Sequence, residues 1–341
     1  MNHRPPNGLD AELLERAEPL ALLQRALARA QAGQGGCVVV VGEAGLGKTS
    51  LIDAAARAAA GTTAGTTAGT TAGAPPTLRW LRAACDDLHT PRPLGPFIDL
   101  AHEFPSTLAD AVHAGKTYNG LFPALLAWLR SVQPTAVLVI EDLHWADEAT
   151  LDGLRYLGRR AADAGCLLLL SLRPAALEAQ PPLRQTLAAL DPSRTTRIEL
   201  EPLSPAAVGL LARRQGDHGP AAAELHKLTG GNPFYVQQLL QAPPGALPGS
   251  LRDAVLAQAA LLPPLVRALL DRISCSPVGL ELALLPADNE ALAGLDSPPA
   301  RALLQVRPPW VHFRHALARR VLEEALPPVR HWQLHQARTR P

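Results

Sequence analysis

The residues best suited to chemistry form a glycine-rich loop at positions 42–49, Gly-Glu-Ala-Gly-Leu-Gly-Lys-Thr. The loop matches the pattern G-x-x-x-x-G-K-[ST] at every fixed position. Glycines let backbone N–H groups close around phosphate oxygens, and the lysine can reach the β- and γ-phosphates of a nucleotide. Lys48 is therefore a predicted catalytic residue, and the predicted nucleotide-binding segment comprises Gly42, Glu43, Ala44, Gly45, Leu46, Gly47, Lys48, Thr49 and Ser50.

The segments beside this loop have the order that phosphate binding requires. Residues 37–41 form a β-branched run typical of a buried strand, and residues 50–60 form an alanine-rich segment with high helix propensity. A helix that begins at the loop adds the positive end of its dipole to the phosphate site. The chain has only three lysines among its 32 cationic side chains, so a lysine at position 48 is not a background residue.

A second group of candidate residues follows the apolar strand predicted at 135–140, where Glu141 and Asp142 are adjacent. Carboxylates at the end of a buried strand are costly unless something there needs negative charge. Here that would be Mg²⁺ and the water that attacks the γ-phosphate. We predict Thr49, Glu141 and Asp142 as the metal-site residues, and both acids as catalytic. We favour Glu141 for the metal and Asp142 for the water, and the reverse assignment remains open.

Two further polar residues lie next to predicted strands or helices. Arg173 comes directly after the apolar segment 166–172, and it is a predicted catalytic sensor of the γ-phosphate or else a surface arginine before Pro174. Asp147 precedes a helical pattern, so we interpret it as a helix N-cap.

Strand patterns at 37–41, 77–85, 135–140, 166–172 and 194–200 alternate with helical segments. This alternation predicts a parallel sheet covered by helices on both faces, hence an α/β fold. Together with the phosphate loop and the paired acids, this fold resembles that of the P-loop NTPases, AAA/ASCE-like. The expected units are an N-terminal helix within 1–36, a core at 37–203 with a low-complexity loop at 61–73, a helical lid at 204–245, and a mostly helical, winged-helix-like piece at 250–341 with a wing near 311–313.

The composition of the chain limits the kinds of partner that we expect for it. The net charge of +1 does not call for nucleic acid or an anionic membrane, and the four cysteines lack metal-site spacing. No apolar run approaches the length of a membrane span and the N-terminus does not resemble a signal peptide, so we expect a cytoplasmic protein. Residues 301–341 hold eight arginines and two glutamates, but they show no DNA-reading helix, and we do not expect direct DNA binding.

An ordered set of segments, VVVVGEAGLGKTSLI, VLVIEDLHWADEATLDGLRYL, LLLLSLRP, LEPLSPAAV, TGGNPFYVQQLL and FRHALARRVLEEALP, resembles the signal-transduction ATPases with numerous domains (STAND). It looks closest to the ATPase module of large LuxR-type bacterial regulators, which also occurs with soluble adenylyl cyclases. The resemblance implies ATP or ADP with Mg²⁺ as ligands, and slow hydrolysis that rearranges the lid and the C-terminal piece. It also implies nucleotide contacts from Arg16, from Pro233 against the adenine, and from His315 near the phosphates.

Three functions remain open at this point. The preferred one is an ATP-hydrolysing signalling switch. Its expected partners are an unidentified protein or signal ligand and further copies of itself. The second is a nucleotide-binding scaffold or a truncated regulator without turnover, and the third is a P-loop kinase that phosphorylates a small acceptor. Replacement of Glu141 and Asp142 by their amides discriminates the first two functions, because a scaffold would bind ATP equally well after both changes and would show no turnover before them.

Overall fold

The computed structural model describes residues 13–61, 78–87, 92–115, 120–215, 222–243, 247–285 and 289–338. Most of the low-complexity loop predicted at 61–73 lies outside these ranges. The five expected strands are present as β1 (Gly36–Val41), β2 (Arg79–Ala84), β3 (Ala136–Glu141), β4 (Leu167–Leu172) and β5 (Thr195–Glu199). They form one parallel sheet in the order β2-β3-β4-β1-β5. The predicted parallel α/β fold is confirmed.

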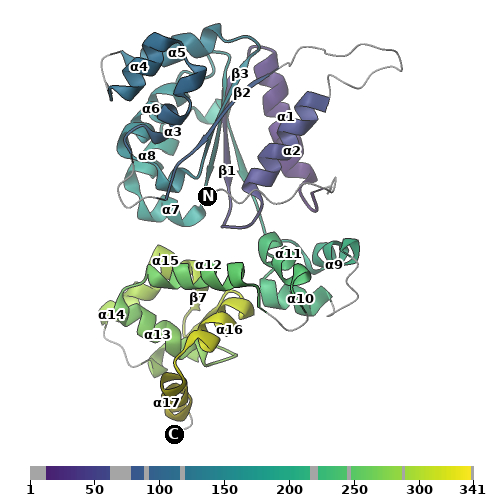
Figure 1. Ribbon diagram of the computed structural model, residues 1–341, viewed down its shortest axis with the longest axis vertical. Helices are drawn as coiled ribbons and strands as arrows, with labels where there is room; N and C mark the ends of the chain where they lie inside the picture. Colours follow the sequence, from purple (N-terminus) through teal and green to yellow (C-terminus); the bar gives the residue numbers. More distant parts are fainter. Residues whose placement is uncertain are drawn as a thin grey trace.

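Both faces of this sheet are buried, because alternate residues of each strand face opposite layers of helices (Figure 1). Val38 and Val40 pack with α1 (Ala17–Gln31) and α2 (Lys48–Gly61), whereas Val39 and Val41 pack on the other side. That second layer consists of α3 (Gly95–Asp99), α4 (Ser106–His113), α5 (Leu121–Ser131), α6 (Glu148–Gly158), α7 (Pro174–Ala179) and α8 (Pro181–Ala188).

An N-terminal helix is present within the range 1–36 where the sequence predicts one. Helix α1 starts at Ala17, and residues 13–16 are not helical. Glu15 has a left-handed backbone, with φ 55°, and its carboxylate accepts hydrogen bonds from the N–H and the hydroxyl of Ser204. These contacts hold the segment against the end of the core, so it cannot continue the helix.

The predicted lid is a bundle of three helices, α9 (Pro205–Arg214), α10 (Ala222–Thr229) and α11 (Pro233–Gln241), with a small core of its own. The hydroxyl of Ser204 caps α9 by accepting a hydrogen bond from the N–H of Ala207, and Pro205 occupies the first helical position. The start of the lid therefore follows directly from the Ser-Pro pair.

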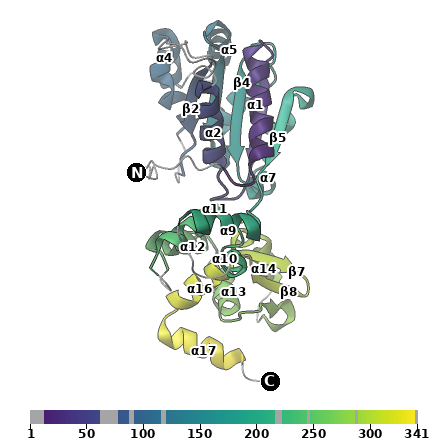
Figure 2. The same cartoon turned by 90° about the vertical axis from the view of Figure 1, so that its right-hand side faces the viewer.

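The C-terminal unit is mostly helical, with α12 (Gly249–Ala260), α13 (Pro264–Ser274), α14 (Asn289–Ala293), α15 (Pro298–Leu303), α16 (Ala316–Ala325) and α17 (Pro328–Arg338). A small antiparallel sheet, in the order β6-β8-β7, joins β6 (Leu280–Glu281), β7 (Leu304–Arg307) and β8 (Trp310–Phe313). The expected wing coincides with β8, and the winged-helix identity of this unit stays a prediction. Helix α17 lies at the end of the molecule farthest from the large sheet (Figure 2). No described helix has the length and apolar character needed to span a bilayer.

Candidate functional site

The glycine-rich loop joins the buried end of β1 to the start of α2, as its pattern predicts. Gly45 and Gly47 have φ angles of 81° and 90°, a region that side chains rarely tolerate. The Lys48 ammonium is buried and donates hydrogen bonds to the carbonyl oxygens of Gly42, at 2.8 Å, and Glu43, at 3.2 Å. Burial lowers the pKa of Lys48, and the charge of Asp142 partly offsets this shift. The ammonium group of Lys48 is thus bonded to backbone carbonyls of its own loop.

Glu141 is the last residue of β3 and contacts the start of α2 directly. The hydroxyl of Thr49 donates to Oε2 of Glu141 at 2.6 Å. The other carboxylate oxygen accepts from Arg82 of β2, whose Nε and Nη2 lie 2.7 and 2.5 Å away. Arg82 also pairs with Asp53 of α2. The structure therefore brings Thr49 and Glu141 together and balances the charge of the glutamate with an arginine that the sequence had not singled out.

Asp142 follows Glu141 but points to a different environment. Its backbone is left-handed, with φ 56°, and its N–H donates to Oγ of Ser171 on β4 at 3.1 Å. Burial raises the pKa of the Asp142 carboxyl, while the nearby cations Lys48 and Arg173 act to lower it. The turn of the chain after β3 thus separates the two acids, with Glu141 toward Thr49 and Asp142 in the charged surroundings of Lys48 and Arg173.

Strand order explains why Arg173 belongs to this group. Strand β4 lies between β1 and β3, and parallel strands end at the same edge of the sheet, so the residue after β4 lies between the loop and the paired acids. The charge of Arg173 influences the pKa values of Lys48 and Asp142. Its buried Nε has no hydrogen-bond partner among the described residues. An unpaired buried donor is costly, and an anionic ligand would satisfy it.

His144 is a buried residue of the same edge that the sequence did not mark as functional. Neither of its ring nitrogens has a hydrogen-bond partner in the described structure. Its pKa is lowered to about 3, first by burial and then by the positive charges of Arg173 and Lys48. His144 is therefore a neutral imidazole at ordinary pH.

The lid contacts the glycine-rich loop through the start of α11. Nδ2 of Asn232 donates to the carbonyl oxygen of Ala44 at 2.9 Å, and the N–H of Phe234 lies 3.3 Å from the carbonyl oxygen of Gly45. Oδ1 of Asn232 also caps α11 by accepting from the N–H of Phe234 at 3.1 Å. Pro233 lies between these two residues at the first helical position, so the structure places it beside the loop. Its predicted contact with adenine stays a prediction.

Arg16 also contacts the loop directly. Its buried guanidinium donates to the carbonyl oxygens of Glu201, at 2.6 Å, and Leu46, at 3.3 Å. Burial lowers the pKa of Arg16. Arg16 thus ties the loop to the chain that leaves β5. A cavity beside it is lined by Glu15, Arg16, Glu201, Pro202, Leu203, Ser204, His226 and Gly230.

His315, directly before α16, lies against the lid and apart from the paired acids. Its ring meets that of Tyr235 edge-on, with centroids 5.7 Å apart, and it packs on Gly230. Burial lowers its pKa to about 4, and its Nδ1 is buried with no partner among the described residues. Burial raises the pKa of Tyr235, which also senses the charges of Arg173 and Glu43. Tyr235 thus contacts His315 on one side and lies within the electrostatic influence of the charged site.

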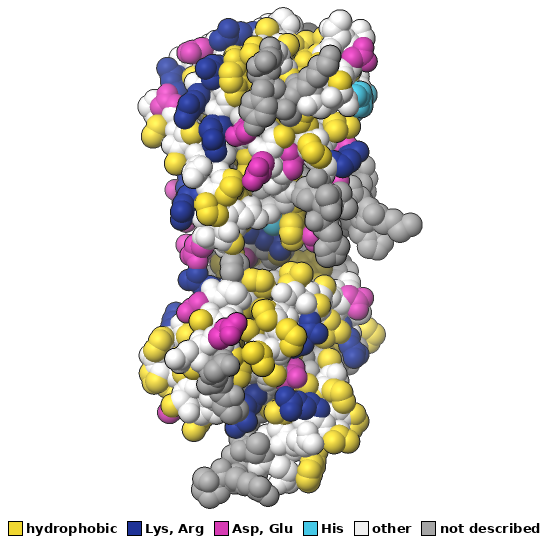
Figure 3. Space-filling view, turned by 90° about the vertical axis from the view of Figure 1, so that its left-hand side faces the viewer, with side chains coloured by type: hydrophobic (Ala, Val, Ile, Leu, Met, Phe, Trp, Pro, Cys, Tyr) yellow, Lys and Arg dark blue, Asp and Glu magenta, His cyan; other side chains and the backbone are white. Residues whose placement is uncertain are grey.

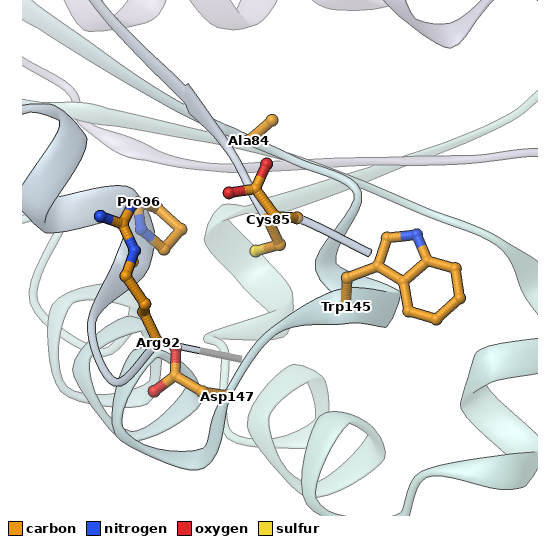
Figure 4. A pocket seen from close by; sticks show the side chains of 8 residues that line it. Ala84, Cys85, Arg92, Pro96, Trp145 and Asp147 are labelled. Carbon is orange, nitrogen blue, oxygen red and sulfur yellow. The ribbon is translucent and has the colours of Figure 1, made fainter. Parts of the chain in front are cut away.

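Figure 3 shows the boundary between the α/β unit and the other helices as a hollow with Lys and Arg side chains inside. A separate small pocket lies at the end of β2, where Cys85, Arg92, Trp145 and Asp147 are among the lining residues (Figure 4). Asp147 is a helix cap, as predicted, because Oδ1 accepts from the N–H of Thr150 at 2.9 Å. This pocket contains none of the predicted site residues.

The structure therefore brings most of the predicted site residues to one edge of the sheet. Lys48, Thr49, Asp142 and Arg173 come after β1, β3 and β4, Glu141 ends β3, and Pro233 of the lid lies beside them. Sequence reasoning missed Arg82, His144, Asn232 and Tyr235 as members of the site. Asn232 had one visible signal, its position before a helix-starting proline, but that signal does not reveal the contact with Ala44.

The oxygen atoms at the start of α2 fit a magnesium ion. The Thr49 hydroxyl and the Glu141 carboxylate touch each other, and Mg²⁺ prefers such hard oxygen ligands, together with water and substrate phosphates. The neighbouring ammonium of Lys48 and guanidinium of Arg173 fit the phosphates themselves.

Residues 12–170 match the family model described as AAA ATPase domain. No curated protein matches the chain. The Walker-type ATPase of Pyrococcus abyssi is a structural neighbour with a TM-score of 0.56 and 12% identity, covering 93% of this chain and 98% of that one. The ORC2 protein of Aeropyrum pernix, solved with ADPNP and ADP, has a TM-score of 0.56 and 15% identity, covering 98% and 97%.

A STAND protein of Pyrococcus horikoshii with a tetratricopeptide repeat sensor has a TM-score of 0.41 and 18% identity, covering 93% of this chain. The present chain spans 45% of the length of that protein. The sheet and the first two neighbours show a P-loop NTPase fold, and the family match over residues 12–170 supports an ATPase module within it.

Proposed function

We propose that this protein is an ATP-dependent switch that hydrolyses ATP slowly and uses the bound nucleotide to control the position of its lid. The observation that carries the proposal is the contact of the lid with the phosphate loop itself, through Asn232 and Ala44. A lid that bonds to the phosphate loop must respond to any ligand that changes the loop. The AAA ATPase domain match and the acids beside Thr49 support hydrolysis as the reaction.

In the proposed mechanism, the N–H groups of the loop and the start of α2 hold the phosphates. Lys48 turns its ammonium from the loop carbonyls toward the phosphate oxygens. Thr49 and Glu141 would hold Mg²⁺, which supplies charge neutralisation on the phosphates when bound. Arg173 donates its unpaired Nε–H to the γ-phosphate. Asp142 orients the attacking water and accepts its proton as the new O–P bond forms and the bond from phosphorus to the ADP oxygen breaks, which yields ADP and phosphate.

The base and ribose of the nucleotide would occupy the cavity behind the loop, between Arg16 and the chain that enters the lid. This cavity lies next to Leu46 of the loop, because Arg16 is bonded to the Leu46 carbonyl. The nucleotide would thus touch the core with its phosphates and the entrance of the lid with its base. Loss of the γ-phosphate would remove the partner of Arg173 and alter the balance between lid positions.

The test is steady-state ATP turnover with Mg²⁺ by the full chain, with nucleotide affinity measured on the same samples. We expect Lys48→Ala to weaken both binding and turnover. Asp142→Asn keeps the size of the side chain, so we expect nucleotide binding within about threefold of wild type and turnover lower by roughly 100-fold or more, the loss typical of general-base positions. Full turnover in Asp142→Asn would refute the assigned role of that residue.

A nucleotide-binding scaffold is the second candidate, because Glu141 is already neutralised by Arg82 and could serve stability alone. It predicts tight ATP binding and no turnover in the wild-type chain. A role in transcriptional regulation, a protein partner, self-association and a cytoplasmic location belong to the proposal through the STAND resemblance. Pull-down and light-scattering experiments on the ATP-bound and ADP-bound chain test the protein partner and the self-association.

A further inference from the structure

A second group of ligand-type side chains lies at the opposite end of the molecule, where α17 follows α16 (Figures 1 and 2). His331 and His335 are four residues apart on α17, so they share one face of that helix. Both rings face Glu323 of α16, and the three side chains can offer one ligand atom each within 4.8 Å of one another. None of them takes part in the proposed ATPase mechanism.

The distances between these ligand atoms suit a metal ion. Nε2 of His331 and Nε2 of His335 are 3.2 Å apart, and Oε1 of Glu323 lies 3.4 Å from His335 Nε2 and 3.8 Å from His331 Nε2. With Zn–N and Zn–O bonds of about 2.1 Å, tetrahedral ligands are roughly 3.4 Å apart. The three observed distances lie close to that edge length. Two imidazole nitrogens that face each other can share only one proton, whereas a cation would engage both lone pairs.

Surrounding contacts hold the carboxylate in place for this role. Arg319 donates to Oε2 of Glu323 at 2.5 Å, which leaves Oε1 directed at the histidines. The same guanidinium donates to the carbonyl oxygen of Ser274 at 2.9 Å, so it is anchored at the end of α13. Outer contacts of this kind orient metal ligands in known sites.

We propose that Oε1 of Glu323 and Nε2 of His331 and His335 bind a divalent transition metal ion of the zinc type, with water in the fourth position. Two histidines and a carboxylate form a ligand set well suited to Zn²⁺. The ion joins α17 to α16 and fixes the C-terminal helix on its unit.

The test is a titration of the chelator-treated full chain with Zn²⁺ against a chromophoric competitor, with Mg²⁺ in excess to occupy the oxygen ligands near Thr49. We expect one saturable equivalent in the wild-type chain. His331→Ala, His335→Ala and Glu323→Gln should each weaken binding by at least ~10-fold, since even outer-shell changes cost that much. His113→Ala, which removes an exposed histidine from α4, is the matched control and should bind like wild type.

Cobalt and hydrogen exchange give independent readouts. Co²⁺ should show the strong visible bands of tetrahedral coordination in the wild-type chain and lose them in the double histidine variant. Zn²⁺ should slow amide exchange in α17 only when both histidines are present. His331→Gln and His335→Gln repeat the test with polar side chains if the alanine variants disturb α17. The absence of saturable Zn²⁺ binding, or equal binding by the double variant, would overturn the proposal.

Discussion

Nδ2 of Asn232 lies 2.9 Å from the carbonyl oxygen of Ala44, so a single side chain of the lid is bonded to the phosphate loop. The same residue caps α11 with its Oδ1. One amide group thus both starts the lid helix and docks it. The closeness of the two elements is also seen at Gly45, where an added Cβ would lie 2.6 Å from Oδ1 of Asn232.

Asn232→Asp separates these two tasks. Aspartate caps helices as well as asparagine does, so α11 should keep its stability, but its carboxylate cannot donate to Ala44. A lost hydrogen bond of about 1 kcal/mol corresponds to a roughly fivefold shift between lid positions. We expect ADP release, followed with a fluorescent analogue in stopped flow, to become about fivefold faster. Asn232→Ala removes the helix cap as well and serves as the comparison. An unchanged rate of ADP release in both variants would show that the hydrogen bond between Asn232 and Ala44 does not hold the lid on the loop.

Arg82→Gln tests the balance of charge around Glu141. The substitution leaves Glu141 and Asp53 without their shared cation, so the melting temperature without nucleotide should fall. Addition of ATP and Mg²⁺ should restore part of the loss, because the metal ion then supplies positive charge beside Glu141. Differential scanning calorimetry with and without ligand measures both effects.

The matched control for that experiment is Arg79→Gln on the same strand. Arg79 pairs with Glu103, and both side chains are more than a third exposed. Exposed pairs contribute little, so this variant should lose less stability and show no recovery specific to Mg²⁺. Equal behaviour of the two variants would argue against a special role for Arg82.

Acid should weaken the fold through two histidines. The pKa values of His144 and His315 are lowered to about 3 and about 4, whereas an unfolded histidine titrates near 6.5. The unfolded chain therefore binds more protons between pH 6.5 and 4, and stability must fall as the pH is lowered through this range. Each histidine contributes a slope of up to about 1.4 kcal/mol per pH unit.

Urea denaturation at several pH values checks this prediction. His315→Asn removes one of the two groups and should reduce the slope of the unfolding free energy with pH by up to one proton. A slope that is identical in His315→Asn and the wild-type chain would show that His315 is free to protonate in the folded state.

Gly230→Ala should disrupt the packing of the His315 ring on residue 230. Gly230 has φ 61°, and an added Cβ would lie 2.1 Å from Nδ1 of the histidine. Gly33→Ala is the matched control, because Gly33 has φ 77° and nothing within 4 Å of the added atom. The control should lose about 1–2 kcal/mol from the backbone alone, and Gly230→Ala about 1–3 kcal/mol more from overpacking. Similar losses in both variants, measured by urea denaturation, would mean that His315 moves aside freely.

The local pattern of the sequence predicted the sheet and the loop, because buried strands and G-x-x-x-x-G-K-[ST] depend on neighbouring residues. The apolar runs before Gly42, Glu141 and Arg173 became β1, β3 and β4, and their parallel order collected the residues that follow them. The sequence predicted a helix within 1–36 but not the residue at which it begins. Its leucine pattern contains no sign that Glu15 would be bound by Ser204, far along the chain.

Long-range contacts also account for the members of the site that the sequence did not reveal. Arg82 reads as an ordinary charged residue in a strand, and only the pairing of β2 with β3 brings it to Glu141. Arg16 was assigned to the nucleotide by resemblance, and its described hydrogen bonds go to backbone carbonyls of the loop and of Glu201. Such bonds involve atoms common to every residue, so no sequence pattern marks them.

The segment 200–204, which joins β5 to the first lid helix, is bonded to Glu15 through Ser204. The segment that leads into α9 is held by a carboxylate that precedes it by 189 positions, next to the Arg16 contact with Glu201. Any swing of the lid about this segment must either break both contacts or drag the beginning of the core with it. Because Arg16 is also bonded to Leu46 of the phosphate loop, a label attached beside Leu13 would report on that loop as well as on the entrance to the lid. The first described residues therefore link the phosphate loop to the segment that leads into the lid.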